Sequence, residues 1–347
     1  MPFDCPDCYK TFNLEYNLGV HRKMACDKKE DTKINMIDLF AGTGAFSTAF
    51  ENTGKVECIF SNDFCKSSEK IYDLNHSINL TNNNLNDIKL NDIPKHDILC
   101  GGFPCQPFSV AGKQQGFDDE RSNVFWKIIK ILKHHKPSIA ILENVKNLES
   151  HDNGDTFKVI CKNLEKIGYH IKFKVLNTCN ITSIPQNRER VYIVCFRNKK
   201  LSEKFSLNFP EVDKKNINQF LETTIPDKYY YTDKLKSFDK IQEGITKDID
   251  ENVLYQYRRY YVRENKSNCC PTLTANMGCG GHNVPLLKDK KGIRKLTPRE
   301  CFNLQGFPQD YKLPEDLCDS ALYKLAGNAV SVPVVQLIAD RLMALAS

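Results

Sequence analysis

Apolar residues recur in short runs along residues 34–196, and these runs alternate with stretches of helical periodicity. The strand-like runs are residues 34–40, 56–61, 97–100, 139–143 and 191–196. Ser122 is the predicted cap of a helix whose apolar face carries Val124, Phe125, Ile128, Ile129 and Leu132. A second apolar stripe, which ends at Gly168, consists of Phe157, Ile160, Leu164 and Ile167. Strands that alternate with helices are typical of an α/β fold built on a parallel sheet.

The periodicity weakens between residues 197 and 291, where strand-like runs are short and polar residues and tyrosines dominate. We expect a second, smaller domain there, and it carries most of the excess positive charge. Apolar periodicity returns at residues 325–346 and predicts a final helix after a turn at Gly327-Asn328. The predicted parts are therefore residues 1–30, residues 34–196 completed by residues 325–347, and residues 197–324, which include a hinge.

Composition narrows the class of protein only slightly. The 49 lysines and arginines outnumber the 43 acidic residues, and the net charge of +6 permits a polyanionic partner without requiring one. Fifteen cysteines, an odd number in a chain long enough to bury a core, favour reduced thiols over a disulfide framework. No apolar run approaches the length of a membrane span, and the N-terminus lacks the pattern of a secretion signal. We expect an intracellular protein of the cytoplasm or nucleus that does not enter a membrane.

A glycine turn, Asp-Leu-Phe-Ala-Gly-Thr-Gly, follows the first strand, so a ligand can approach bare backbone at Gly42 and Gly44. Glycines alone predict no more than a tight turn, but Phe40 offers a flat face, and Asp63 ends the next strand, where a carboxylate can bind ribose hydroxyls. Asp87, which follows the third unit, is a candidate for the adenine amino group, although taken alone it is more typical of an ordinary solvated loop acid. The third glycine of a dinucleotide fingerprint is absent and no phosphate loop follows, which predicts a nucleoside ligand such as S-adenosylmethionine.

The densest group of unusual residues is Gly-Gly-Phe-Pro-Cys-Gln-Pro-Phe-Ser at residues 101–109, directly after a predicted strand. Most cysteines in such a chain are small buried hydrophobic residues. Two glycines and two prolines, however, fix the backbone around Cys105 at the mouth of the sheet, which a presented thiolate needs and ordinary packing does not. Gly112 and Gly116 can act as hinges of a mobile loop that follows. The pattern predicts Cys105 as a nucleophile.

Two further polar groups are expected at the same edge of the sheet. The strand at residues 139–142 leads into Glu143, and the segment Gln-Asn-Arg-Glu-Arg aims Arg188 or Arg190 at the crevice. Taken singly, the first could be an ordinary acid at a strand end and the second a basic turn.

Together these groups fit methyl transfer to carbon 5 of cytosine. Carbon 5 is too weak a nucleophile to take the methyl group, so the thiolate of Cys105 adds at carbon 6 and makes an enamine. Glu143, with its pKa raised in a closed, dry site, can give N3 a proton or a strong hydrogen bond. The target atoms are hidden in a stacked duplex, so the base must rotate out, which costs about a few kcal/mol.

The motifs and their order resemble the DNA cytosine-C5 methyltransferase family, of the compact bacterial restriction-modification type, over residues 35–342. The matching segments are residues 38–44, 102–109, 143–145, 186–190, 294–300 and 327–330. The resemblance implies a doubly wound, Rossmann-like α/β catalytic domain that binds S-adenosylmethionine, closed by the C-terminal helix. It also implies a small target-recognition domain and a monomer that acts on double-stranded DNA.

The resemblance assigns roles residue by residue. It makes Cys105 the nucleophile and places Glu143, Arg188 and Arg190 in the catalytic site. The implied cofactor contacts are Phe40, Ala41, Gly42, Gly44, Asp63, Phe64, Asp87, Ile88, Pro104, Asn328 and Val330. Thr272 resembles the family's threonine that contacts the DNA backbone, and we expect Ser109, Lys113, Arg258 and Arg259 as further DNA contacts. Ala111 departs from the pattern, because relatives can carry there a polar residue that fills the space the base leaves, so that role is assigned to nothing.

The first 30 residues predict a separate zinc finger. Cys5 and Cys8, then His21 and Cys26, have the spacing of zinc ligands, and Phe12 lies where a small ββα finger needs its core. In such a finger, the helix positions that would contact DNA bases are mostly apolar here. The sequence therefore fits contact with a protein partner at least as well as contact with DNA. The alternative to a zinc site is a set of reduced cysteines that bind no metal.

Two other functions compete with this one. A branch of the family methylates transfer RNA, but it usually carries a Cys-Phe-Thr tripeptide that this chain lacks. A DNA-binding relative without activity would keep the fold, yet Cys105, Glu143, Arg190 and the cofactor turn are all intact. The target sequence is not predicted, because no code links Arg258 or Arg259 to particular bases.

Overall fold

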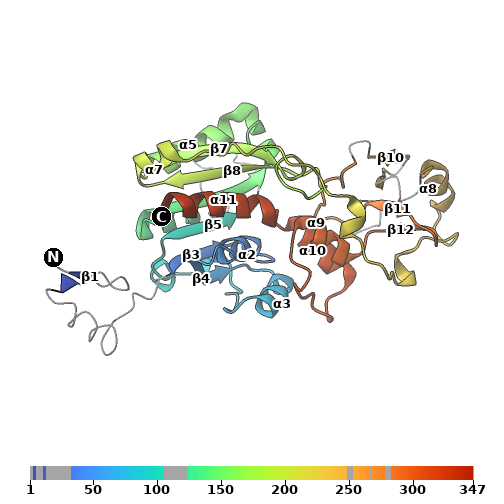
Figure 1. Cartoon of the computed structure of the whole chain (residues 1–347), viewed down its shortest axis with the longest axis horizontal. Helices are drawn as coiled ribbons and strands as arrows, with labels where there is room; N and C mark the ends of the chain where they lie inside the picture. Colours follow the sequence, from blue (N-terminus) through green and yellow to red (C-terminus); the bar gives the residue numbers. More distant parts are fainter. Residues whose placement is uncertain are drawn as a thin grey trace. The chain divides into compact units, whose positions relative to one another are not determined.

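The computed structural model describes residues 3–4, 11–12, 33–104, 123–247, 253–258, 260–265, 268–277 and 283–346 (Figure 1). The chain divides into two compact units, Met1–Ile34 and Asn35–Ser347. In the first unit, strands β1 (Phe3–Asp4) and β2 (Thr11–Phe12) pair antiparallel, with Phe3 opposite Phe12. The predicted zinc ligands Cys5, Cys8, His21 and Cys26 lie outside the described residues.

A six-stranded sheet forms the centre of the second unit, in the order β4-β3-β5-β6-β8-β7. Its strands are β3 (Ile34–Leu39), β4 (Val56–Asn62), β5 (Ile98–Gly102), β6 (Ile139–Val145), β7 (His170–Asn177) and β8 (Glu189–Phe196). β3, β5 and β6 run parallel, whereas β8 is antiparallel to both of its neighbours. The prediction of a parallel sheet is therefore wrong for β8, which is antiparallel to β6 and β7, and the sheet is mixed. The reason is that β7 and β8 lack the long crossover that parallel neighbours need.

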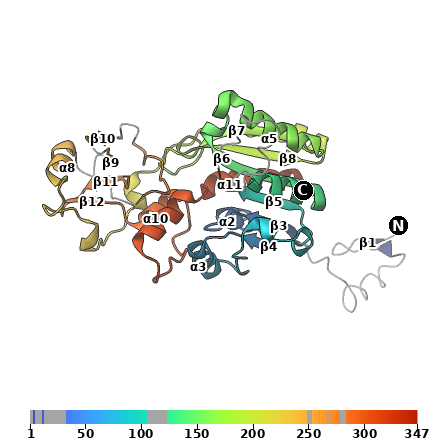
Figure 2. The same ribbon diagram turned by 180° about the vertical axis from the view of Figure 1, so that it is seen from behind.

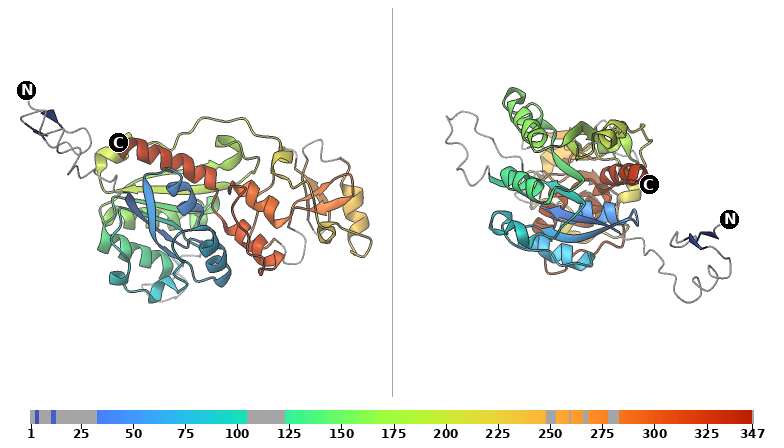
Figure 3. Two further views of the ribbon diagram at one scale, coloured as in Figure 1. Left: turned by 60° about the horizontal axis from the view of Figure 1, so that its bottom comes forward. Right: turned by 90° about the vertical axis from the view of Figure 1, so that its left-hand side faces the viewer.

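Helices cover both faces of this sheet, as the two views in Figure 3 show. The α-helices of this part are α2 (Ala45–Glu51), α3 (Lys66–Asn75), α4 (Asn123–His135), α5 (Asp155–Lys166), α6 (Thr178–Ile181) and α7 (Lys199–Lys204). Short 3-10 helices are η1 (Leu85–Asp87), η2 (Leu90–Asp92), η3 (Lys146–Leu148) and η4 (His151–Gly154). The predicted apolar stripes are confirmed: Phe125, Ile128, Leu132, Ile160 and Leu164 are buried in one core cluster with the strands.

A four-stranded antiparallel sheet lies beyond α9 and α10 (Figure 1, Figure 2). Its order is β10-β9-β11-β12, from β9 (Tyr255–Tyr257), β10 (Val262–Glu264), β11 (Leu286–Lys288) and β12 (Ile293–Lys295). The helices of this part are η5 (Ile217–Phe220), η6 (Asp227–Tyr229) and α8 (Phe238–Gly244). A small core of its own, which includes Ile241, Tyr255 and Leu286, supports this sheet.

The C-terminal segment forms α9 (Pro298–Gln305), α10 (Asp319–Asn328) and α11 (Val332–Ala346). Gly327 and Asn328 are the last residues of α10, so the predicted turn falls instead at residues 329–331. Asp319–Leu345 is the one stretch of the described chain that is long and apolar enough to cross a membrane, and 67% of the 18-residue apolar window within it is buried inside the protein. Its second helix, α11, packs against α2. This burial is that of a core helix.

Candidate active site

The turn after β3 adopts a backbone that few residues tolerate. Phe40, Gly42 and Gly44 have φ values of 56°, 55° and 70°, in the left-handed region that favours glycine. The hydroxyl of Tyr311 donates a hydrogen bond of 2.7 Å to the carbonyl of Thr43 and so fixes the turn from the C-terminal segment. The predicted glycine turn is thus a rigid feature at the carboxyl end of β3.

Asp63 follows β4 and faces this turn. Its Oδ2 accepts a hydrogen bond from the backbone N–H of Gly42 at 3.0 Å, and its Oδ1 accepts one from Cys65 at 2.8 Å. Burial raises the pKa of Asp63, while these hydrogen bonds lower it. The backbone of Phe64 and the side chain of Ser68 also donate to this carboxylate. The adjacent ring of Phe64 is 74% exposed, which leaves its flat face open.

The remaining predicted cofactor residues lie at neighbouring strand ends. A Cβ on Gly101 would lie 3.8 Å from the ring of Phe40. Phe40 and Ile88 belong to the same apolar cluster as Phe103, whereas Asp87 is exposed at the end of η1. Other predicted contacts occupy the same unit: Ala41 and Val330 are buried, and Pro104 and Asn328 are exposed.

The backbone that leads to Cys105 is fixed by its neighbours. Phe103 is buried, and its carbonyl accepts a hydrogen bond of 2.9 Å from the side chain of Asn144. Its ring packs against Phe125, with centroids 5.9 Å apart. Cys105, Ser109 and Lys113 lie outside the described residues. Asn144 therefore fixes the backbone two residues before the predicted nucleophile, a contact that no sequence pattern indicates beyond its place next to Glu143.

Glu143 stands beside the start of the same loop. Gly102 and Glu143 are register partners on the parallel strands β5 and β6. A Cβ on Gly102 would lie 3.4 Å from Glu143 Oε2 and 3.5 Å from Val330 Cγ2. The glycine thus leaves room for the carboxyl group at the edge where Cys105 follows. The sequence-based expectation that these two strand ends meet is confirmed.

Arg190 pairs with this carboxyl group. Arg190 Nε lies 3.2 Å from Glu143 Oε1, and both side chains are largely buried. This ion pair lacks the geometry of a hydrogen bond, so among the described residues Oε1 has no hydrogen-bond donor and can accept one from a ligand. Burial raises the pKa of Glu143, against the opposing charges of Arg190 and Arg188. A buried carboxyl group with a raised pKa is suited to give a proton near neutral pH.

Arg188 points elsewhere. Its guanidinium donates hydrogen bonds to the carbonyls of Leu273 at 3.0 Å, Gly327 at 3.2 Å and Ala329 at 2.6 Å. Burial lowers the pKa of Arg188 to about 9, with a smaller effect from Arg190 in the same direction. These bonds hold the Leu273 and Gly327–Ala329 segments against Arg188, whereas sequence analysis places Arg188 in the catalytic site beside Arg190.

The segment at residues 270–274 joins the small sheet to the catalytic strands. The hydroxyl of Thr272 donates a hydrogen bond of 2.6 Å to the carbonyl of Asn187. The backbone N–H of Asn187 in turn donates to the carbonyl of Cys270 at 2.8 Å. Gly327 approaches this segment so closely that a Cβ would lie 2.2 Å from the backbone of Thr274. Gly327 is therefore required for the close packing of α10 against this segment.

The Arg-x-Leu-x-Pro-Arg-Glu motif has a structural role. Arg294 and Glu300 form a buried, two-pronged ion pair with N–O distances of 2.8 and 2.9 Å. Glu300 also completes a capping box with Thr297 at the start of α9. The motif thus fixes the entry of the helix that follows the small sheet.

Comparisons with known proteins agree with this geometry. Residues 34–344 match the family model described as C-5 cytosine-specific DNA methylase. The chain is 49% identical to the type II methyltransferase M.Bsp6I of Bacillus sp. (strain RFL6), over 89% of this chain and 98% of the relative. It is 35% identical to the type II methyltransferase M.HhaI of Haemophilus parahaemolyticus, over 90% and 94% of the two chains.

Solved structures share the fold at lower identity. The S. pombe Dnmt2 methyltransferase superposes with a TM-score of 0.70 at 20% identity, over 90% of this chain and 99% of that one. The Entamoeba histolytica methyltransferase EhMeth gives a TM-score of 0.68 at 21% identity, over 90% and 98%. The family match covers the six-stranded sheet, the small sheet and the C-terminal helices alike. The chain therefore belongs to the C-5 cytosine-specific DNA methylase family and is a type II DNA (cytosine-5)-methyltransferase.

Proposed function

We propose that Cys105 and Glu143 carry out the methyl transfer on a cytosine rotated out of duplex DNA. The observation that carries this proposal is the position of Glu143, a buried carboxyl group with a raised pKa beside the bare backbone of Gly102. That backbone leads within three residues to the predicted nucleophile. Arg190, the partner of Glu143, is the second group that would contact the base.

The chemistry divides between these groups. The thiolate of Cys105 adds to carbon 6, the electron pair of the C5–C6 double bond moves toward N3, and Glu143 gives N3 its proton. Carbon 5 of the resulting enamine can then accept a methyl group. A base must next remove the proton on carbon 5, so that the thiolate leaves from carbon 6, the C5–C6 double bond returns, and N3 gives its proton back to the Glu143 carboxylate. Arg190 orients the base and keeps Glu143 in place.

S-adenosylmethionine fits the turn after β3. It supplies an activated methyl group when bound. We assign the ribose hydroxyls to Asp63, whose two oxygens are already directed by backbone N–H groups, and the adenine to the exposed ring of Phe64. Further contacts are proposed from the residues that surround this turn: Phe40, Ala41, Gly42, Gly44, Asp87, Ile88, Pro104, Asn328 and Val330.

Replacement of Asp63 by alanine is expected chiefly to weaken the binding of S-adenosylmethionine. Loss of hydrogen bonds to an ionised acceptor costs about 1.5–3 kcal/mol each, so affinity should fall by about 10-fold or more. Titration calorimetry with S-adenosylmethionine measures this directly, and Asp73→Ala on α3 gives a control of the same charge change. Unchanged affinity in Asp63→Ala would remove the assignment.

Duplex DNA is the proposed substrate, held between the two sheets. Thr272 lies at their junction, and Arg258 is exposed on the small sheet. Ser109, Lys113 and Arg259, the other proposed DNA contacts, lie outside the described residues. The ten cysteines of the described chain are free thiols, in keeping with a protein of the reducing cytoplasm.

Methylation of mixed-sequence duplex DNA with S-adenosylmethionine tests the proposal, with a parallel sample of transfer RNA. Cytosine-conversion sequencing should find marks at one short DNA motif and none on the RNA. Marks on RNA alone would assign the chain a transfer-RNA substrate, and marks on neither would mean that it binds without chemistry.

We propose in addition that residues 1–30 form a structural zinc site with Cys5, Cys8, His21 and Cys26 as ligands. The antiparallel pair β1–β2 supports this, because Cys5 follows β1 directly and a ββα finger begins with such a hairpin. The family match begins at residue 34, so the finger would be an accessory to the methyltransferase. Its partner would be DNA or another protein.

Chelation of this zinc is expected to loosen the finger without stopping methyl transfer. Metal binding and folding are coupled in small zinc modules, so residues 1–30 should lose their hydrogen-exchange protection. Elemental analysis should find one zinc ion per chain, and none after Cys5→Ser with Cys8→Ser. Complete loss of methyl transfer on chelation would show that the finger is integral to the enzyme.

A further inference from the structure

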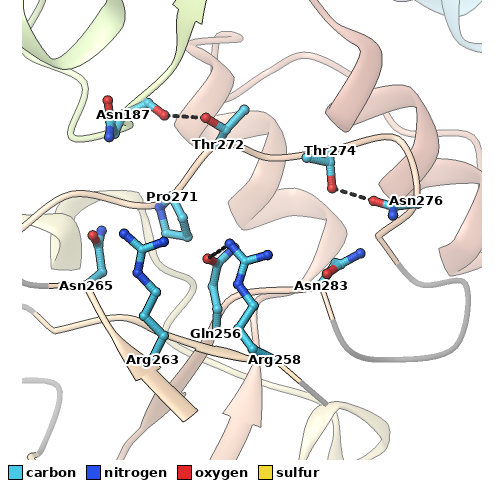
Figure 4. A pocket seen from close by; sticks show the side chains of 10 residues that line it. All are labelled: Asn187, Gln256, Arg258, Arg263, Asn265, Pro271, Thr272, Thr274, Asn276 and Asn283. Atoms are coloured by element: carbon cyan, nitrogen blue, oxygen red, sulfur yellow. Dashed lines mark hydrogen bonds between the residues drawn. The ribbon is translucent and has the colours of Figure 1, made fainter. Parts of the chain in front are cut away.

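A polar cavity of about 330 Å³ lies between the small sheet and the junction with the catalytic strands (Figure 4). Its ten lining residues are two arginines, four asparagines, two threonines, a glutamine and a proline. None of them is acidic, so the arginines meet no carboxylate in this lining. A cavity of this composition suits a ligand rich in hydrogen-bond acceptors.

The arginines share one face of the β9–β10 hairpin with a buried glutamine. Gln256 and Arg263 are opposite each other in the antiparallel register, and Arg258 follows Gln256 by two residues. Opposed residues, and residues two apart, point to the same face of a sheet. In Figure 4 the three side chains stand side by side and point into the cavity.

Gln256 holds Arg258 in one orientation. Arg258 Nη2 donates a hydrogen bond of 2.9 Å to Gln256 Oε1, and Gln256 is only 7% exposed. Arg258 itself is exposed, so its other N–H groups are open to a ligand. A guanidinium held in one plane can bind any partner that presents two acceptors side by side, which includes phosphate oxygens as well as a planar base edge. The choice between these two partners depends on where the side chain lies.

The hairpin has the shape to carry this side chain into a groove. The backbone N–H of Arg258 donates to the carbonyl of Tyr261 at 2.8 Å, which closes a narrow tip. Tyr260 and Tyr261, at that tip, are 85% and 60% exposed. A two-stranded ribbon fits the major groove of B-form DNA, where guanine presents O6 and N7 next to each other.

We propose that Arg258, positioned by Gln256, reads the O6 and N7 atoms of a guanine in the target sequence. The proposal rests on the proposed action on duplex DNA and adds a residue that determines sequence specificity. Gln256 is a positioning residue in this arrangement. The target sequence must then contain at least one guanine whose replacement the enzyme rejects.

Methylation of a randomised duplex library by the wild-type enzyme and by variants tests this. Arg258→Ala should lose about 10- to 100-fold of its preference for guanine at one position, with other positions unchanged. Gln256→Leu should relax the same position to a smaller extent. Lys240→Ala, which removes an exposed charge on α8 outside the cavity, should keep the wild-type preference. Calorimetry with S-adenosylmethionine verifies that each variant is folded.

Replacement of that guanine by 7-deazaguanine removes the N7 acceptor alone. The wild-type enzyme should methylate the 7-deazaguanine duplex less efficiently than the guanine duplex, and so discriminate less between it and duplexes with other bases at that position. Arg258→Ala should methylate the guanine and 7-deazaguanine duplexes equally well. Uniform weakening on all sequences, with a shallower salt dependence, would make Arg258 a phosphate contact and overturn the proposal. A wild-type target without an invariant guanine would also overturn it. Absence of any methylation by the wild-type enzyme would instead remove the proposed function itself.

Discussion

Cys105→Ser is expected to lower the rate of methyl transfer by at least about 10⁴-fold, as loss of a catalytic nucleophile does in other enzymes. A free cysteine thiol has a pKa of about 8.5, so cysteine in general presents some thiolate near neutral pH. A serine hydroxyl is far less acidic and presents no comparable anion to carbon 6. Binding of S-adenosylmethionine should persist, because the turn after β3 and Asp63 are untouched. Single-turnover assays measure the rate, and Cys318→Ser, at an exposed cysteine, is the matched control.

A trapped intermediate separates the nucleophile from a merely structural cysteine. A duplex with 5-fluorocytosine at the target should give a covalent complex with the wild-type enzyme, because fluorine cannot leave carbon 5 as the proton does. The complex should survive denaturation and be absent with Cys105→Ser. Normal turnover by the variant, or a complex formed by it, would exclude Cys105 from the role.

The residues at the carboxyl ends of the central strands were predictable, because strand ends and glycine turns can be recognised from a few adjacent residues. Gly42 and Gly44 precede a helix after an apolar strand, and the structure gives them left-handed backbones. The strands before Gly102 and Glu143 are short apolar runs, and their parallel pairing brings both ends to one edge. Such features depend on a few adjacent residues, and sequence patterns report those well.

Strand direction and long-range pairing were not predictable in the same way. β7 alternates two lysines, Lys172 and Lys174, with apolar residues at the edge of the sheet, and the apolar run of β8 carries no sign of its direction. Arg188 lies just before the start of β8, whereas Arg190 lies within it. The side chain of Arg188 donates to three carbonyls from segments far along the chain, and sequence patterns do not report such contacts.

The small sheet shows the same limit. Arg258 stands out as a basic residue, but its partner Gln256 and the opposed Arg263 come together only through the register of the β9–β10 hairpin. Three-residue strands give too little periodicity to reveal that register from sequence. The sequence therefore indicates a basic recognition domain, and the structure is needed to identify a fixed guanidinium within it.

Glu143→Gln is expected to reduce methyl transfer by about 10²- to 10⁴-fold, the range in which a general acid contributes. The amide of glutamine can donate a hydrogen bond to N3 but cannot give it a proton. Burial raises the pKa of Glu143, so the protonated form persists to higher pH than in an ordinary glutamic acid. Activity that needs this proton is present below the raised pKa and lost as pH rises through it.

The pH dependence distinguishes this role from simple support of Arg190. The profile of kcat/KM should fall at high pH in the wild-type enzyme, and Glu143→Gln should lose that fall. The folded state also holds the Glu143 proton more tightly than the unfolded state, so stability decreases as pH rises from the ordinary pKa toward the raised one. Thermal unfolding of Glu143→Gln should lack this decrease, and Glu165→Gln, exposed on α5, should retain it. A wild-type pH profile in Glu143→Gln would show that the carboxyl group positions Arg190 and gives no proton.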